Sequence, residues 1–122
     1  MSEVLLDHVQ IAAPADCEAA ARRFFGELVG LAEVEKPEPL RARGGVWFAV
    51  GRGQLHVGVE ADFEPARKAH VALRLGAAEL DVLAERLVAA GVPVTWDDSL
   101  PGERRFYSGD PWGNRIEFLA RP

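Results

Sequence analysis

Apolar and polar residues alternate in several short segments of the chain and recur at helical spacing in two others. Alternation is typical of half-buried strands, whereas apolar residues three and four positions apart indicate one face of a helix. Asp16 is the expected N-cap of the first helix, and Gly30 is expected to end it. In the first half we predict a strand at 4–12, a helix at 16–29, a weak extended segment at 31–40, and strands at 46–50 and 54–60.

The second half of the chain repeats this order after a polar connector at 61–68. Gly91 is expected to end the helix, and the residues at 110–113 form a turn before the last strand. We predict a strand at 69–75, a helix at 78–90, an extended piece at 93–96, and strands at 104–108 and 114–120. Each half therefore has the order βαβββ.

The two halves also match residue by residue. His8-Val9 matches His70-Val71, 62 positions later, and Leu55-His56-Val57 matches Ile116-Glu117-Phe118, 61 positions later. We interpret this near-constant offset as the duplication of a module of about 60 residues; accidental similarity of two α+β units is the alternative. The prediction is one α+β domain over 1–122, with modules at about 4–60 and 69–120 paired into a cup-shaped mixed sheet.

Composition narrows the functional classes. The 122 residues are 48% apolar and 27% charged, which excludes a disordered tail, a collagen-like repeat and a coiled coil. The net charge of −5, without a basic run, argues against binding to nucleic acid or to an anionic membrane. Neither a signal peptide nor a membrane span is visible, and the single cysteine excludes an internal disulfide, so we expect a cytoplasmic protein.

The three histidines of the chain fall at matching positions of the two modules. Since alternate strand residues share a face, His8, His56, His70 and Glu117 are all predicted to lie on the face turned away from the helices. If the two sheets curve toward each other, these side chains converge. Three imidazoles and one carboxylate can bind Zn, Fe, Mn, Co or Ni. The alternative for each histidine is an ordinary surface or hydrogen-bonded role.

Other side chains are candidates for the chemistry or the wall of such a site. Glu117 is a ligand first and a proton shuttle if it can detach. Glu60 is a second candidate base, with a salt bridge at the strand end as its alternative. Tyr107 is a candidate hydrogen-bond donor to a bound oxygen, whereas Phe106 and Cys17 are expected to be buried. The predicted substrate pocket comprises Trp47, Gln10, Arg74, Arg115 and Trp96.

Five segments carry a resemblance to a known family: DHVQIAA, FFGELVGL, QLHVGVE, AHVALRL and FYSGDPWGNRIEFL. Over essentially the whole chain, the sequence resembles the vicinal oxygen chelate superfamily, which includes glyoxalases, bleomycin-resistance proteins and extradiol dioxygenases. The resemblance implies paired βαβββ modules that form a cup around one divalent metal ion. Carried over by position, the metal ligands are His8, His56, His70 and Glu117.

The resemblance also implies a function. It predicts a metal-dependent enzyme, a glyoxalase-like lyase or isomerase or a dioxygenase, that chelates a small substrate through adjacent oxygens, and it predicts a homodimer. The slot of His56 more often holds Glu or Gln in glyoxalase-type lyases. His8, His70 and Glu117 match the two-His-one-carboxylate set of extradiol dioxygenases and fosfomycin-modifying thiol transferases. The alternatives are a metal-free drug-binding protein of the bleomycin-resistance type and a scaffold with a vestigial site.

Overall fold

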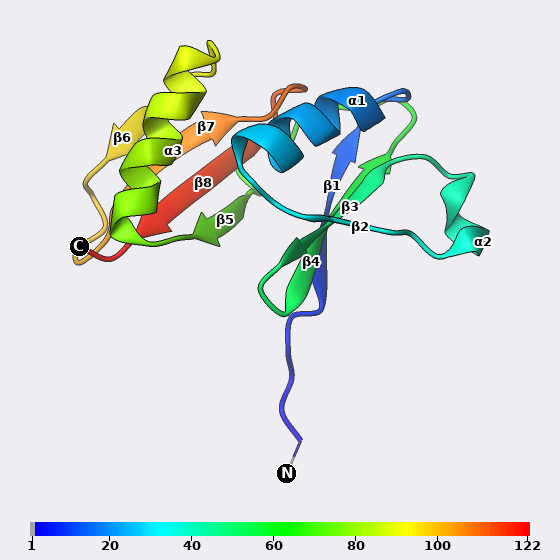
Figure 1. Ribbon diagram of the computed structural model, residues 1–122, viewed down its shortest axis with the longest axis horizontal. Helices are drawn as coiled ribbons and strands as arrows, with labels where there is room; N and C mark the ends of the chain where they lie inside the picture. Colours follow the sequence, from blue (N-terminus) through cyan, green and yellow to red (C-terminus); the bar gives the residue numbers. More distant parts are fainter. Residues whose placement is uncertain (1) are drawn as a thin grey trace. The chain divides into compact units, whose positions relative to one another are not determined.

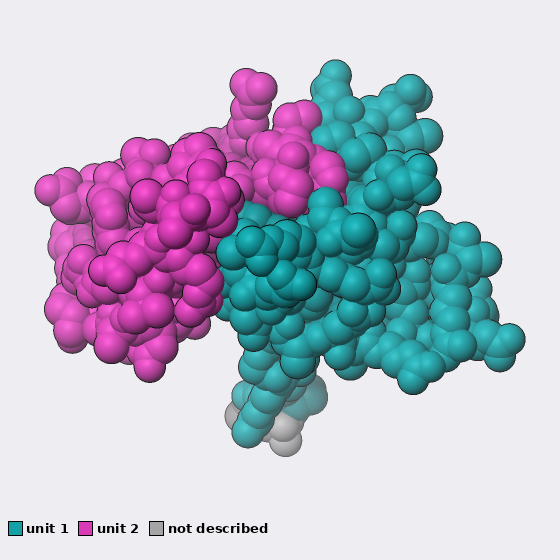
Figure 2. Space-filling model, turned by 45° about the horizontal axis from the view of Figure 1, so that its top comes forward, with its two compact units in different colours: residues 1–64 teal, residues 65–122 magenta. Residues whose placement is uncertain are grey.

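A computed structural model describes residues 2–122 of the chain. The chain divides into two compact units, Met1–Glu64 and Pro65–Pro122, which are coloured separately in Figure 2. Each unit contains one four-stranded mixed sheet and its own helices. We call them the first and the second unit.

The first unit begins with strand β1 and two consecutive helical segments, and its remaining strands follow a short helix (Figure 1). In its sheet, β1 runs parallel to β4, and β3 is antiparallel to both β4 and β2. The elements are β1 (His8–Ala13), α1 (Glu18–Ala21), the π-helical segment η1 (Arg22–Leu28), β2 (Glu33–Val34), α2 (Glu38–Arg41), β3 (Val46–Val50) and β4 (Gly53–Val59).

The second unit has the same strand order around one longer helix. Its first strand, β5, runs parallel to β8, and β7 is antiparallel to both β8 and β6. The elements are β5 (Val71–Arg74), α3 (Ala77–Ala89), β6 (Thr95–Asp97), β7 (Arg104–Gly109) and β8 (Arg115–Ala120). The predicted α+β architecture of two βαβββ sheets is confirmed.

Strand pairing repeats in register as well as in order. On the parallel side, Gln10 is opposite His56 in the first sheet, and Ala72 is opposite Glu117 in the second. On the antiparallel side, His56 pairs with Trp47, and Glu117 pairs with Tyr107. His56 and Glu117 therefore occupy equivalent positions on the central strand of each sheet.

The predicted elements differ from the structure at some boundaries. The first strand starts at His8 rather than at position 4, and the first helix starts at Glu18. Asp16 is not its N-cap, since Asp16 has a left-handed backbone (φ 63°) that a short polar side chain tolerates. The segment at 31–40, predicted as weakly extended, contains the two-residue strand β2 and the start of the short helix α2, which the sequence did not predict because of its two prolines. Its N-terminal turn accepts a proline because the first N–H groups of a helix have no partner within it.

Each unit has its own apolar core between helix and sheet. Phe25, Phe48, Leu55 and Val57 are fully buried in the first unit. The fully buried side chains of the second core include Phe106, Phe118, Ile116, Leu80 and Leu87. Phe106 and Cys17 are buried as predicted, and burial raises the pKa of the Cys17 thiol. Within residues 2–122, no helix is long and apolar enough to cross a membrane.

Candidate functional site

Three rings stack on one face of the first sheet. The His56 imidazole lies 4.4 Å from that of His8 and 3.8 Å from the Trp47 indole, and it is almost parallel to the indole, at 1°. Because β4 lies between β1 and β3, His56 is held between its two neighbours. This cover explains why a polar side chain on the face away from the helix is only 5% exposed.

Hydrogen bonds fix the ring nitrogens of the two histidines. His8 Nδ1–H donates to the carboxylate of Asp7 at 2.8 Å, which leaves the lone pair of the neutral ring on Nε2. His56 Nε2–H donates to Gln54 Oε1, also at 2.8 Å. Burial lowers the pKa of His56, and the neighbouring His8 lowers it further. His56 is therefore a neutral ring held inside a stack.

In the second unit, His70 and Glu117 are in direct contact. His70 Nδ1–H donates to the Lys68 carbonyl oxygen at 2.9 Å, and a carbonyl can only accept. In the neutral ring, Nε2 is then an acceptor, yet it lies 2.9 Å from Oε1 of Glu117, another acceptor. Two lone pairs at this distance require a positive charge between them, either a proton or a metal ion. Two ligand atoms bound side by side to one ion at about 2.1 Å would lie about 3 Å apart, which matches this spacing.

Glu117 also has a cationic neighbour. Arg105 Nη1 lies 3.3 Å from Glu117 Oε2, and the same guanidinium reaches Asp97 at 3.3 Å. The side chain of Glu117 is only 7% exposed. A buried carboxylate is costly unless it is paired, and the Arg105 guanidinium supplies a compensating charge.

Tyr107 lies beside this pair. Its ring meets His70 edge-on at 5.7 Å, and the Arg115 guanidinium covers the ring at 3.8 Å. Since Tyr107 pairs with Glu117 across β7 and β8, both side chains belong to the same face of the sheet. The structure thus brings Tyr107 beside His70 and Glu117, with Arg115 over the Tyr107 ring.

Two predicted pocket residues of the second unit have other surroundings. Arg74 forms a two-pronged ion pair with Glu103, at 2.7 and 2.9 Å. Trp96 pairs with Phe106 on the helix-covered face and lies 5.1 Å from that ring. It lines a hollow of 590 Å³ that also involves Arg104 and α3, away from the face of Glu117. Trp96 is therefore removed from the candidate site.

In the first unit, a cavity of 440 Å³ opens beside the ring stack. His8, His56, Trp47 and Gln10 line it, as expected for members of one face. Lys36 and Arg43 also line it, and sequence reasoning missed both because the segment before β3 shows no periodicity. Glu60 is exposed just beyond the end of β4.

The four predicted ligands thus occur as two pairs, His8 with His56 in the first unit and His70 with Glu117 in the second. Within residues 2–122, no group of three or more His, Cys, Asp or Glu side chains is arranged to hold a metal ion.

The turn between β7 and β8, the most distinctive stretch of the sequence, is structural. Buried Asp110 accepts hydrogen bonds from the backbone N–H groups of Trp112 and Asn114 and from the Asn114 side chain. Asn114 Oδ1 in turn accepts the N–H of Ala66 at 2.8 Å. Burial raises the pKa of Asp110 despite these bonds. The turn therefore ties β8 to the start of the second unit.

Comparison with solved structures gives several close folds. A glyoxalase family protein from Bacillus anthracis is 44% identical over all of both chains, with a TM-score of 0.91. A glyoxalase/dioxygenase from Nostoc punctiforme is 21% identical over 100% of this chain and 99% of its own, with a TM-score of 0.78. A lactoylglutathione lyase from Agrobacterium tumefaciens is 22% identical over 98% and 96%, with a TM-score of 0.71. No protein-family model matches the chain, and no curated protein matches it.

Proposed function

The chain belongs to the glyoxalase family of the vicinal oxygen chelate superfamily, and on this premise we propose that it is a divalent-metal-dependent enzyme acting on a small substrate with adjacent oxygens. The observation that carries the proposal is the 2.9 Å contact between His70 Nε2 and Glu117 Oε1, which needs a positive charge between the two atoms. A divalent cation suits this place in charge, in spacing and in ligand type.

The histidine orientations support the same reading. Metal-binding histidines usually donate their second ring N–H to a carboxylate or a carbonyl, which fixes the tautomer and orients the ring. His8 donates to Asp7 and His70 donates to the Lys68 carbonyl, in both cases through Nδ1. The two residues are repeat equivalents, and in both the hydrogen bond at Nδ1 leaves Nε2 as the proposed ligand atom; in His70 this atom lies 2.9 Å from Glu117 Oε1.

We propose that His8, His70 and Glu117 bind one ion, with His56 as a fourth ligand. The two pairs would act together within one chain or across a homodimer. Fe, Mn, Ni, Co and Zn all accept this donor set. When bound, the ion would act as a Lewis acid that stabilises negative charge developing on a substrate oxygen.

The remaining side chains would orient the substrate and handle protons. Tyr107 is the proposed hydrogen-bond donor to a bound oxygen, and the Arg115 guanidinium lies over the Tyr107 ring. Glu117 is proposed as a ligand whose second oxygen stays with Arg105. Glu60 is proposed as a second base at the end of β4. Trp47 and Gln10 would form the wall of the pocket.

Metal analysis of the protein, purified without added metal and again after reconstitution, tests the proposal. We expect about one ion per site, and less than about 0.2 ion per chain in both samples would contradict it. His70→Ala should abolish metal uptake while the circular dichroism stays unchanged. Tyr107→Phe is the matched control and should keep the metal. Retention of metal by His70→Ala would show that the ligands are misassigned.

A second candidate is a metal-free small-molecule or drug-binding protein of the bleomycin-resistance type. The Glu117–Arg105 contact favours it, because a guanidinium already compensates the only carboxylate of the set. The ring stack of His56 is likewise complete without a ligand. The metal analysis separates the two candidates, since this one predicts small-molecule binding that neither a chelator nor reconstitution changes.

A further inference from the structure

The cavity of the first unit has an unbalanced charge. Lys36 and Arg43 stand in the wall of this 440 Å³ hollow, beside His8 and His56. Among the described residues that line it, none is an Asp or a Glu. This is unexpected in a chain with a net charge of −5. The positive charge is therefore local: the fold brings Lys36 and Arg43 to one cavity although the chain as a whole is acidic.

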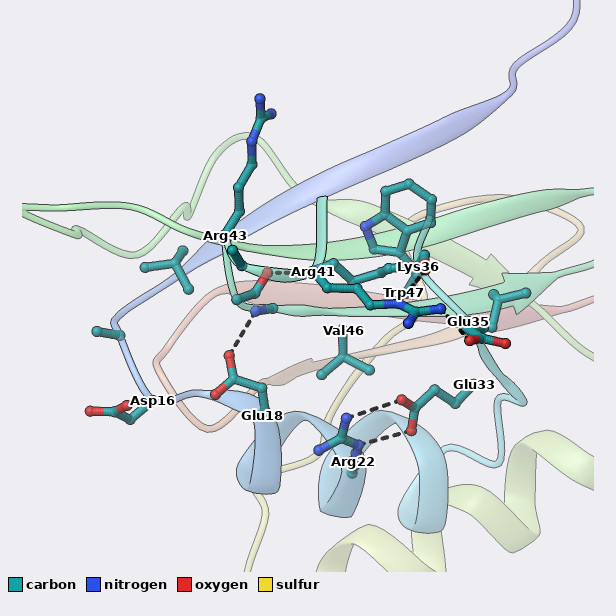
Figure 3. A pocket seen from close by; sticks show the side chains of 16 residues that line it. Asp16, Glu18, Arg22, Glu33, Glu35, Lys36, Arg41, Arg43, Val46 and Trp47 are labelled. Atoms are coloured by element: carbon teal, nitrogen blue, oxygen red, sulfur yellow. Dashed lines mark hydrogen bonds and ion pairs between the residues drawn. The ribbon is translucent and has the colours of Figure 1, made fainter. Parts of the chain in front are cut away.

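The acidic side chains in this part of the unit already have partners. Glu18 accepts the N–H of Gly45 at 2.7 Å, and Glu33 pairs with Arg22 at 2.9 Å. Glu35 pairs with Arg41. Figure 3, which looks into the neighbouring hollow, shows Arg43 and the Trp47 indole pointing away from the Glu18, Arg22 and Glu33 side chains. Within residues 2–122, the Arg43 guanidinium has no hydrogen-bond or ion-pair partner.

The segment that carries the two cations is fixed in place. Lys36 Nζ donates to the Gly44 carbonyl oxygen, and Arg41 Nε donates back to the Lys36 carbonyl at 3.1 Å. Gly45 has a positive φ of 88°, and a Cβ at this position would lie 2.1 Å from the Val57 carbonyl oxygen. Only glycine allows this close approach to β4. Because an ammonium has three N–H donors, Lys36 keeps two for a ligand.

From these observations we infer that the cavity receives an anionic oxygen group of the substrate, a carboxylate, phosphate or phosphonate, between Lys36 and Arg43. The inference rests on the proposed function only in taking this ligand to be the substrate. Charge-assisted hydrogen bonds to an ammonium and a guanidinium are the strong contacts that such a group makes. The Trp47 indole in the same wall would face the apolar part of the molecule, next to His8 and His56.

The experiment is a titration of metal-free protein, treated with a chelator and desalted, at constant ionic strength. The probes are phenylphosphonate and benzoate, with benzamide as the neutral analogue. Binding is followed by NMR at the Trp47 indole N–H and at the amides of Gly44 and Gly45. Both anions should shift these signals saturably, and the affinity of benzamide should be lower by a factor of about ten or more.

Matched charge-removing variants locate the binding. Arg43→Gln and Lys36→Gln should each weaken phenylphosphonate binding about tenfold, whereas Lys36→Arg should retain most of it. Arg52→Gln removes the same charge at the β3–β4 turn of the same unit and should change nothing. Equal losses in Arg52→Gln, equal binding of benzamide, or no saturable shift at these signals would each overturn the inference.

Because the titration contains no metal, its outcome is independent of the metal analysis. Metal uptake without anion binding would overturn this inference and leave the metal-dependent activity standing. Anion binding without metal uptake would leave the cavity as an anion site and overturn the metal-dependent activity.

Discussion

The two units share strand order and register, yet their equivalent central positions hold opposite kinds of group. In the first unit the position belongs to His56, a neutral ring stacked between His8 and Trp47. In the second it belongs to Glu117, a carboxylate held between His70 and Arg105. The first site is thus an aromatic stack, and the second is a network of charges.

This difference shows that the repeated backbone places a side chain at the same point of each sheet, whereas the side chains on neighbouring strands determine its surroundings. Trp47 and Tyr107 are both opposite the central position, but the indole lies flat on His56, and the phenol stands edge-on to His70 under Arg115. A flat stack protects a neutral ring from water. A ring turned aside leaves space for cations around a carboxylate. Two units with the same strand order and register can therefore carry different chemistry at equivalent positions.

The largest expected effect comes from replacing the residue at each of the two equivalent central positions by Gln, one at a time. Glu117→Gln should lower metal affinity about a hundredfold or more, because it removes the only negative ligand. His56→Gln should lower it only about tenfold, because a neutral ring is replaced by a neutral amide that still offers an oxygen. Competition with a chromophoric chelator measures both affinities. A larger loss in His56→Gln would show that the first unit carries the principal ligands.

The turns at the ends of the two central hairpins also differ, which predicts a stability effect confined to the second unit. Asn114→Ala should reduce the free energy of unfolding by about 1–3 kcal/mol, because Asp110 and the N–H of Ala66 both lose a buried partner. Arg52→Ala, in the β3–β4 turn, should change it by less than about 0.5 kcal/mol. Urea unfolding measures both, and equal losses would contradict the structural role of the longer turn.

A smaller effect sharpens the contrast in charge. The Arg105 guanidinium lies 3.3 Å from Oε2 of Glu117, where it would repel a cation bound at the other oxygen and draw on the charge of the same carboxylate. Arg105→Gln should therefore raise metal affinity about three- to tenfold. Arg115→Gln, which uncovers Tyr107 instead, is the matched control and should leave the affinity unchanged. A loss of affinity in Arg105→Gln would mean that Arg105 acts by orienting Glu117 as a ligand.

The sequence predicted the fold well because strand periodicity is a local property. The strand Val46–Val50 has the predicted bounds, and the helix Ala77–Ala89 is displaced by one residue. The segment at 31–40 was predicted as weakly extended, which fits β2 but not α2. The short helix was missed because local hydrogen bonds around it, such as that from Lys36 to Gly44, rather than an apolar face hold this part of the chain. For the same reason Lys36 and Arg43 escaped notice as cavity residues.

The candidate site was only partly predictable. Period-two alternation put Trp47, His56 and Glu117 on the face away from the helices, and the pairing of His56 with Trp47 agrees with this, because side-chain direction follows from strand position. The pairing of Glu117 with Tyr107 comes from the structure. Trp96 was assigned to the pocket because it lies near the second hairpin in the sequence, and a strand of three residues is too short for its pattern to define a face. The contact of Glu117 with Arg105 depends on cross-strand pairing, which alternation does not reveal. The union of the two ligand pairs on one metal ion stays a prediction.

The smallest expected effect tests the aromatic stack through its response to pH. Burial lowers the pKa of His56 below its ordinary value of 6.5, with a further lowering from His8 and Lys36 and an opposing effect from Asp7. The unfolded chain therefore takes up a proton at a higher pH than the folded chain. The His56 contribution to stability is complete above about pH 6.5 and declines as the pH falls toward the lowered pKa.

Urea midpoints of metal-free protein at about pH 7.5 and 5.5 should reveal this decline as a difference between wild type and His56→Gln. The titration of groups that do not interact with His56 is common to both proteins and cancels in this difference. A difference that is the same at both pH values would mean that water reaches the ring, and the stack would then not be what keeps His56 neutral.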